Sequence, residues 1–236
     1  RLGLIIILGV AWSFYLFSGD ETNPGNEESY SEDISPVRNQ VRRCAVTLTE
    51  NRVSNLLEQG GLTDEELDQR ISSASINAHE LEAVDMYGDD SLTVPYWYYS
   101  EDSPDCGQCS TKTEVPPLNR ENSLQSKTET YVESNIRTCL NDFDEFDGLS
   151  VDAGTPDATV RFNENDTQVT MDWPMTITSD TSEQTFDVNT VTGRSEIAVK
   201  PIYEAAKAAT VRLATENLPA TYIQKLVTYN SFDNQI

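Results

Sequence analysis

The stretch that decides the fold is ATVRFNENDTQVTMDW, residues 158–173. Apolar and polar side chains alternate on both sides of a central polar segment, NEND at 163–166. Alternation with a period of two is the pattern of a strand with one buried face, and polar residues between two such runs favour a turn. The stretch therefore predicts an antiparallel β-hairpin, and we expect further strands at 175–178 and 185–191.

Segments with helical spacing lie on both sides of this hairpin. Ser35 is predicted as the N-cap of a first helix with Pro36 in its first turn, and Thr63 and Glu66 form a capping box before a second helix. The predicted helices lie at 35–60, 63–71, 120–143 and 201–213. In the last of these, the residues predicted to face the core are Ile202, Ala205, Ala206, Ala209 and Leu213.

The remaining segments are shorter. Residues 79–99 alternate and end in aromatic side chains, which predicts another hairpin. Residues 103–119 are predicted as a loop and residues 147–156 as a break after the third helix. Together these segments predict an α+β fold, in which long helices pack on a mainly antiparallel sheet.

The chain begins with a long apolar run, RLGLIIILGVAWSFYLFS at residues 1–18. As a helix of about 1.5 Å per residue, its apolar part is about 24 Å long, against about 30 Å for a bilayer core. Three interpretations compete: a cleaved secretory signal, a retained membrane anchor, and the stem of a pilin-like filament subunit. We favour retention, because no strong cleavage site follows the run. The residues predicted to contact lipid or other copies of the chain are Leu4, Ile5, Ile6, Ile7, Leu8, Val10, Trp12, Phe14 and Leu16.

Charge around this run predicts its orientation. Arg1 precedes it, whereas Asp20 and Glu21 follow it. Positive charge stays on the cytoplasmic side of a membrane, so we expect the rest of the chain to be extracellular. Residues 19–34 are predicted as a flexible acidic linker, and residues 35–236 as the ectodomain.

The whole chain is strongly acidic, with 40 acidic and 16 basic residues and a net charge of −24. Repulsion among carboxylates destabilises a folded chain in dilute buffer, and molar salt shortens the Debye length to about 3 Å. The charge therefore predicts a protein of a salt-loving organism, the alternative being an acidic extracellular protein from a mesophile. It disfavours nucleic-acid binding, which needs clustered Lys and Arg.

Four cysteines in an exported protein allow three disulfide pairings. Cys44 and Cys139 each lie on the predicted inward face of a long helix, while Cys106 and Cys109 share one loop. We therefore expect Cys44 to pair with Cys139 and Cys106 with Cys109. The first bond would close a loop of roughly 95 residues and stabilise the fold by about 4 to 5 kcal/mol.

Sequence motifs for catalysis or cofactor binding are weak. The Cys106 to Cys109 segment has the spacing of a redox pair but the composition of a loop, whereas such a pair normally begins a helix. The one histidine, His79, has no nucleophile elbow to accompany it. Residues 142–147 are acidic but fail the EF-hand pattern. We therefore predict no catalytic residue, metal or cofactor, although forty acids leave the paired carboxylates of a hydrolase, or a ligand- or cation-binding protein, as alternatives.

Two surface features are candidates for contact. The aromatic run Tyr96, Trp97, Tyr98 and Tyr99 could contact a sugar or a partner, the alternative being that its rings pack into the core. Asn165 begins a glycosylation sequon in the predicted hairpin turn, which suits an extracellular domain.

Several segments together resemble a known group. They are the apolar N-terminal helix with its polar spacer, residues 36–61 with a mid-helix Cys, the segment 95–99, the ending 138–143 of the third helix, and the hairpin after it. This combination resembles membrane-anchored, secreted surface proteins of small-genome halophilic archaea. The resemblance implies a cell-surface location, supports the pairing of Cys44 with Cys139, and implies no activity.

The sequence thus predicts a non-enzymatic archaeal cell-surface protein with a structural or adhesive role. Its partner is expected to be the lipid bilayer, or copies of itself in a homo-oligomer or pilin-like filament, through the N-terminal helix. The alternative is a membrane-tethered extracytoplasmic hydrolase or a ligand- or cation-binding protein.

Overall fold

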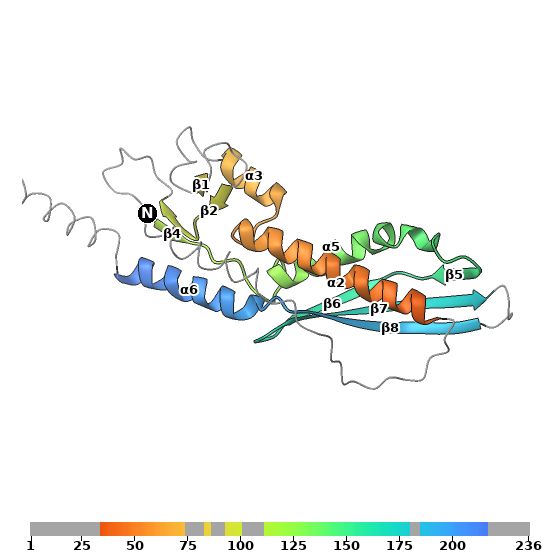
Figure 1. The fold of residues 1–236 in the computed structure, drawn as a ribbon. Coiled ribbons are helices and arrows are strands. Elements are labelled where there is room, and N and C mark those ends of the chain that lie inside the picture. Colours follow the sequence, from red (N-terminus) through yellow and green to blue (C-terminus); the bar gives the residue numbers. More distant parts are fainter. Residues whose placement is uncertain (1–33, 74–82, 86–92, 101–110, 180–184, 217–236) are drawn as a thin grey trace, which may run out of the picture. The chain divides into compact units, whose positions relative to one another are not determined.

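The computed structural model describes residues 34–73, 83–85, 93–100, 111–179 and 185–216. These residues form helices and an antiparallel sheet, which confirms the predicted α+β class (Figure 1). The helices are α2 (Ser35–Glu58), α3 (Asp64–Ser73), α5 (Leu124–Cys139), η1 (Asn141–Phe143) and α6 (Val199–Glu216). The strands are β1 (Ala83–Asp85), β2 (Thr93–Pro95), β3 (Tyr98–Ser100), β4 (Thr111–Thr113), β5 (Leu149–Ala153), β6 (Asp157–Phe162), β7 (Thr167–Ser179) and β8 (Thr185–Ser195).

The main sheet is built around the long strand β7. The hairpin predicted at 158–173 is present, with β6 antiparallel to the first half of β7. Strand β5 pairs with the second half of the same edge, and β8 pairs with β7 along the other edge. The shorter strands form two further antiparallel pairs, β1 with β2 and β3 with β4.

A bulge in β7 keeps the inner face of this sheet apolar. The register with β8 shifts between Asp172 and Met175, so that one extra β7 residue is accommodated. As a result Val188 and Val191, which are three residues apart in β8, are both buried. Pairing without the bulge would turn one of them toward solvent, because side chains alternate across a strand.

Helices α2 and α5 cover the inner face of the sheet (Figure 1). Helix α2 packs on β8 and β7, and α5 packs along β6. A small apolar cluster of Val53, Leu124 and Val199 joins α2, α5 and the start of α6. In α2, the positions predicted to be buried are buried in the structure. The buried residues predicted for α2 are Val41, Cys44, Ala45, Leu48 and Leu56.

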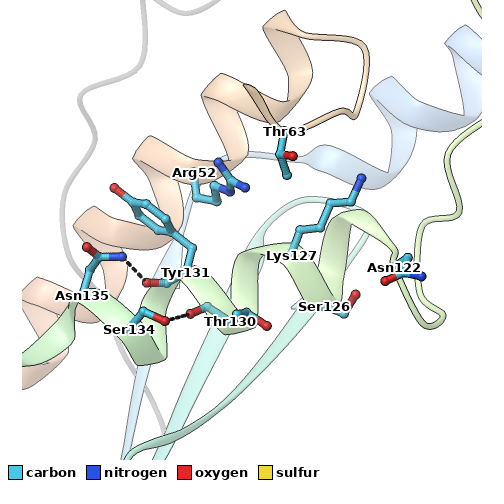
Figure 2. A pocket seen from close by; sticks show the side chains of 9 residues that line it. All are labelled: Arg52, Thr63, Asn122, Ser126, Lys127, Thr130, Tyr131, Ser134 and Asn135. Carbon is cyan, nitrogen blue, oxygen red and sulfur yellow. Dashed lines mark hydrogen bonds between the residues drawn. The ribbon is translucent and has the colours of Figure 1, made fainter. Parts of the chain in front are cut away.

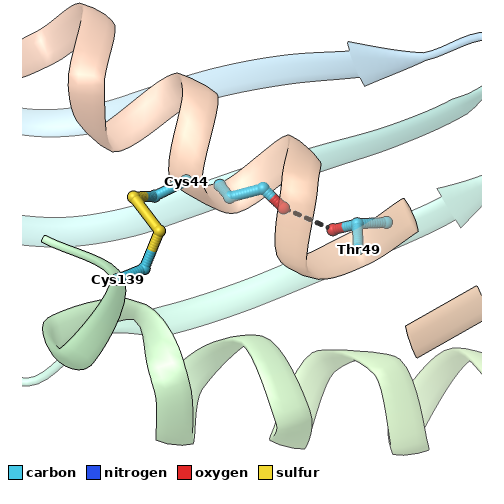
Figure 3. The surroundings of a disulfide bond; sticks show 4 residues. Cys44, Thr49 and Cys139 are labelled. Carbon is cyan, nitrogen blue, oxygen red and sulfur yellow. Dashed lines mark hydrogen bonds between the residues drawn. A yellow bond between two sulfur atoms is a disulfide. The ribbon is translucent and has the colours of Figure 1, made fainter. Parts of the chain in front are cut away.

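A disulfide ties the two helices together. Cys44 in α2 is bonded to Cys139 at the end of α5, with a Cα–Cα distance of 5.9 Å, which confirms the predicted pairing (Figure 3). One turn further along α2, the Thr49 hydroxyl donates to the Ala45 carbonyl at 2.7 Å and is buried with its polar group satisfied. The bond therefore fixes α2 and α5 over the same face of the sheet.

Helix α5 also protects an edge of the sheet. The backbone N–H groups of Ala158 and Val160 in β6 donate to the carboxylates of Glu133 and Glu129, both at 2.9 Å. An unpaired strand edge is a template for association with another chain, and these two carboxylates occupy its donors. Two of the many acids in the chain thus have a structural role.

The structure corrects several predicted elements. Ile34, assigned to the linker, is buried, and α2 begins at Ser35 without a side-chain cap, so Ser35 is not the N-cap. The predicted strand at 175–178 is part of β7. Strand β4 lies within the segment predicted as a loop, and β5 lies within the predicted break. Both are short and are stabilised by pairing with β3 and β7, which the local sequence does not show.

The predicted inward face of the last helix is wrong in part: Ile202 and Ala209 are half-buried, and the side chain of Leu213 lies outside the described residues. Ala205 and Ala206 are exposed, whereas Tyr203 and Thr210 are buried. The helix begins at Val199, before the proline that was taken as its start, and the bulky Tyr203 ring packs 5.9 Å from the ring of Trp97. Aromatic rings bury a large area each, so in this alanine-rich helix the Tyr203 ring contributes most to the choice of the buried face.

Among the described residues, no helix has both the length and the apolar character needed to cross a bilayer. The predicted apolar helix at 1–18 lies outside the described residues, as do Cys106, Cys109 and the predicted linker up to residue 33.

Candidate functional site

The aromatic run is partly built into the fold. Trp97 Nε1 donates to the Gly60 carbonyl at 2.6 Å, and its ring packs against Tyr203 of α6. Tyr98 is half-buried, and Tyr99 pairs through its backbone in β3. Tyr96 remains 39 % exposed, and burial of the rest of its side chain raises its pKa. Among Tyr96, Trp97 and Tyr98, whose side chains the structure describes, Tyr96 is the most exposed ring, while Trp97 has a structural role.

Two glycines permit this packing. Gly60 and Gly61 end α2 with positive φ angles of 62° and 88°. A Cβ on Gly60 would lie 3.0 Å from Pro95 Cγ, and one on Gly61 would lie 2.9 Å from Pro116 Cγ. The turn therefore needs glycine both for its backbone conformation and for the close approach of two prolines.

The sequon lies at an exposed turn, as predicted. Asn165 is exposed between β6 and β7, in a turn closed by a hydrogen bond from Asn163 N to Asp166 O at 2.9 Å. The sequon's Thr167 is buried, and its hydroxyl donates to Ile197 O at 2.7 Å. A glycan on Asn165 would extend into solvent without disturbing the sheet.

Acidic residues do not gather into a metal site in the described part of the chain, where no group of three or more His, Cys, Asp or Glu side chains is arranged to hold an ion. Asp142, Asp144 and Asp147 are each exposed at the end of α5 and the turn that follows.

A polar pocket between α2 and α5 is the site that the sequence did not predict. Its volume is about 360 Å³, and Figure 2 shows the side chains around it. Nine residues line it, and none of them is acidic, although the chain has 40 acids. We call it the Arg52 pocket; its lining residues are Arg52, Thr63, Asn122, Ser126, Lys127, Thr130, Tyr131, Ser134 and Asn135.

Helix α5 supplies most of this lining because of its spacing. Ser126, Thr130 and Ser134 recur every four residues, and Lys127 and Tyr131 follow the same interval, so these side chains lie along one side of the helix. The helix begins with a capping box, in which Ser123 and Ser126 bond each other's backbone N–H groups. The capped start fixes where this polar face begins.

Arg52 enters the pocket from α2. Its guanidinium carbon lies 5.2 Å from the centre of the Tyr131 ring, a cation–π contact that orients the group (Figure 2). Its Nε is buried and has no hydrogen-bond acceptor in the described part of the chain. The contact with Tyr131 thus fixes the guanidinium of Arg52, whose Nε–H group has no acceptor among the described residues.

Lys127 closes one end of the pocket. Its Nζ donates to Gly61 O at 3.0 Å and to Glu66 Oε2 at 2.6 Å, and its side chain is only 10 % exposed. Glu66 in turn accepts from Thr63 N at 2.7 Å in the predicted capping box. Burial raises the pKa of Glu66, but the bonds from Lys127 and Thr63 and the charge of Lys127 outweigh it, so the pKa lies below its usual 4.5.

The polar pattern of α5 was visible in the sequence, but it signals a solvated helix face as readily as a site. What makes it a pocket is the approach of Arg52 and Thr63 from α2 and the turn before α3, which sequence spacing does not reveal.

Comparisons of the chain with protein-family models, with curated proteins and with solved structures give no significant match.

Proposed function

We propose that this chain is a non-enzymatic surface protein of a halophilic archaeon, held at the cell surface by residues 1–18, with residues 35–236 exposed for structural or adhesive contacts. The observation that carries the proposal is the disulfide between Cys44 and Cys139. Disulfides persist outside the cytoplasm and are rare within it, so a structural disulfide supports an extracellular location. The acidic composition and the exposed sequon turn at Asn165 fit the same location.

The more specific form of the proposal is a pilin-like filament, in which the apolar helices of many copies pack together. In a filament, each apolar helix contacts the apolar helices of neighbouring copies instead of lipid. A run of about 24 Å, shorter than the roughly 30 Å bilayer core, is easier to bury in this way than across lipid.

Expression of the full chain in a halophilic host, beside a truncated chain whose residues 1–18 are replaced by a cleavable secretory signal, tests the proposal. The full chain should remain with the cells and be digested by protease added to intact cells, whereas the truncated chain should be released into the medium. Retention of the truncated chain on the cells, or protection of the full chain from protease, would overturn the proposal.

Electron microscopy of the same cells separates the two forms. Filaments labelled by an antibody against the ectodomain support assembly. A detergent-solubilised monomer together with cells free of such filaments would rule out the filament and leave the membrane tether.

A ligand-binding function is a second candidate, because the Arg52 pocket is favourable for a small polar anion. A hydrolase using paired carboxylates stays a prediction from composition.

A further inference from the structure

The lining of the Arg52 pocket differs in charge from the strongly acidic chain as a whole. In a chain of net charge −24, its lining contains two cations and no carboxylate. Lys127 is already paired with Glu66, whose carboxylate lies next to the pocket. Arg52 therefore supplies the excess positive charge at this place, and a ligand with a single negative charge would match it.

The guanidinium of Arg52 is held in a fixed orientation, which favours binding of such a ligand. Tyr131 holds it by its face, and the buried Nε lacks an acceptor among the described residues. This Nε is closed to a ligand by the surrounding protein atoms, so a ligand would meet the terminal nitrogens of the guanidinium. A carboxylate matches the planar fork of an arginine with two parallel hydrogen bonds.

The rest of the lining fits hydroxyl groups. Thr130 and Ser134 have hydroxyls, and Asn122 and Asn135 have amides that both donate and accept. Asn135 Nδ2 already donates to Tyr131 O at 2.8 Å, which orients its side chain at the pocket (Figure 2). Such groups bind a polyhydroxylated ring rather than an apolar ligand.

The volume of the pocket suits a small organic ligand such as a polyhydroxylated ring. About 360 Å³ lies at the lower end of the range of roughly 300 to 1,000 Å³ for small-molecule sites, and is much more than a lone inorganic anion fills. One unmatched cation also suits a monovalent carboxylate better than a divalent phosphate monoester.

We propose that the Arg52 pocket binds an acidic sugar, a hexuronic acid unit whose carboxylate pairs with Arg52 and whose hydroxyls bond to the polar side chains of α5. The proposal goes beyond the surface function proposed above and holds whether or not residues 1–18 anchor the chain. It gives an adhesive ectodomain a defined chemical partner.

Calorimetric titration of the whole chain with tetragalacturonate at fixed KCl concentration tests the proposal, with the neutral tetrasaccharide maltotetraose as the comparison ligand. We expect saturable binding of tetragalacturonate and none of maltotetraose. Absence of saturable binding, or equal binding of the neutral sugar, would overturn the proposal.

Matched variants locate the site. Arg52→Gln should weaken binding at least about tenfold, since it removes the charged hydrogen bonds. Arg43→Gln makes the same change at an exposed position of the same helix outside the pocket, and should leave affinity within about twofold. Equal losses in the two variants would mean that net charge alone drives binding.

A second variant guards against misfolding of Arg52→Gln. Thr130 is exposed on α5, so Thr130→Glu should fold normally while adding a carboxylate to the lining that Thr130 shares with Arg52. It should abolish binding, and full affinity in this variant would contradict the assigned site.

The two proposals fail separately. If the chain binds tetragalacturonate but the truncated chain stays on the cells, only the surface tether is refuted.

Discussion

Lys127 joins three elements through one ammonium group. It lies on α5, donates to the Gly61 carbonyl after α2, and pairs with Glu66 in the first turn of α3. Because its side chain is almost fully buried, its charge needs both partners to offset the loss of hydration. The turn that carries Thr63 into the Arg52 pocket is held by this group.

The pair makes a pH-dependent contribution to stability. The pKa of Glu66 is depressed in the folded chain, so its stabilising effect is present above the unfolded value near 4.5 and is lost as pH falls through the lower folded value. Glu66→Gln should therefore unfold more easily than wild type at pH 7, by no more than about 1 kcal/mol for a partly exposed pair. Thermal melts between pH 7 and pH 3 should show this difference shrinking with acidification.

The control is Glu65→Gln, which removes a carboxylate from the same helical turn without changing a contact of Lys127. A gap between wild type and Glu66→Gln that stays constant from pH 7 to pH 3 would argue against the assigned linkage.

At the residue scale the sequence foresaw local bonds only. The capping box between Thr63 and Glu66 was predicted because its partners lie three positions apart. Lys127 was not connected with it, because that contact spans 61 positions in sequence and depends on how the helices pack.

The disulfide between α2 and α5 is the main constraint at the scale of elements. It closes a loop of 95 residues, so Cys44→Ala/Cys139→Ala should lose about 4 to 5 kcal/mol in the chain-entropy model. Urea unfolding at constant KCl measures the loss. Cys106→Ser/Cys109→Ser, whose predicted bond would close a very short loop, should lose much less.

Thiol labelling of the unreduced wild-type protein is an independent check on this bond. Labelling at Cys44 or Cys139 in the folded protein would mean that the bond does not form.

Helix α2 approaches β8 closely at one glycine. A Cβ on Gly193 would lie 2.5 Å from Val46 Cγ2, which is too close for two carbons. Gly193→Ala should therefore destabilise the chain by about 1 to 3 kcal/mol, as overpacking does. Chemical unfolding of this variant gives the cost.

Val46→Ala removes the clashing methyl group, so the double variant Gly193→Ala/Val46→Ala should recover most of the loss. A double variant whose destabilisation equals the sum of the two single changes would show that the helix and strand do not meet there.

Element prediction succeeded where one face of a segment is clearly apolar. The buried positions of α2 and the β6–β7 hairpin were correct because their periods are unambiguous. The face of α6 was predicted only in part, because its alanines give no strong apolar stripe and Tyr203, which contacts Trp97, lies at the centre of the buried side. Strands β4 and β5 were missed because short strands depend on a partner for their stability.

The surface charge acts on the molecule as a whole. With 40 acids against 16 bases, no arrangement of ion pairs neutralises the excess. Pairs such as Arg194 with Asp166 and Lys200 with Glu164 relieve the repulsion only locally. The melting temperature should therefore rise between dilute buffer and molar KCl, as the Debye length falls from about 10 Å to about 3 Å.

Thermal melts in a KCl series, followed by circular dichroism, measure this effect. A sucrose series is the matched control, because it stabilises compact states without screening charge. A melting temperature that does not change with KCl would contradict the halophilic interpretation.

By itself, the sequence determined the features that depend on neighbouring residues: the hairpin and its turn, the capping box between Thr63 and Glu66, the apolar face of α2, the charge and the fold class. The pairing of Cys44 with Cys139 was also predicted correctly, although the predicted inward position holds only for Cys44; Cys139 lies exposed at the last residue of α5. Only the tertiary structure decided which faces meet, and with them the buried face of α6 and the Arg52 pocket. The physical reason is that the pocket is made by side chains from separate elements, whose approach depends on packing of the whole core rather than on local periodicity.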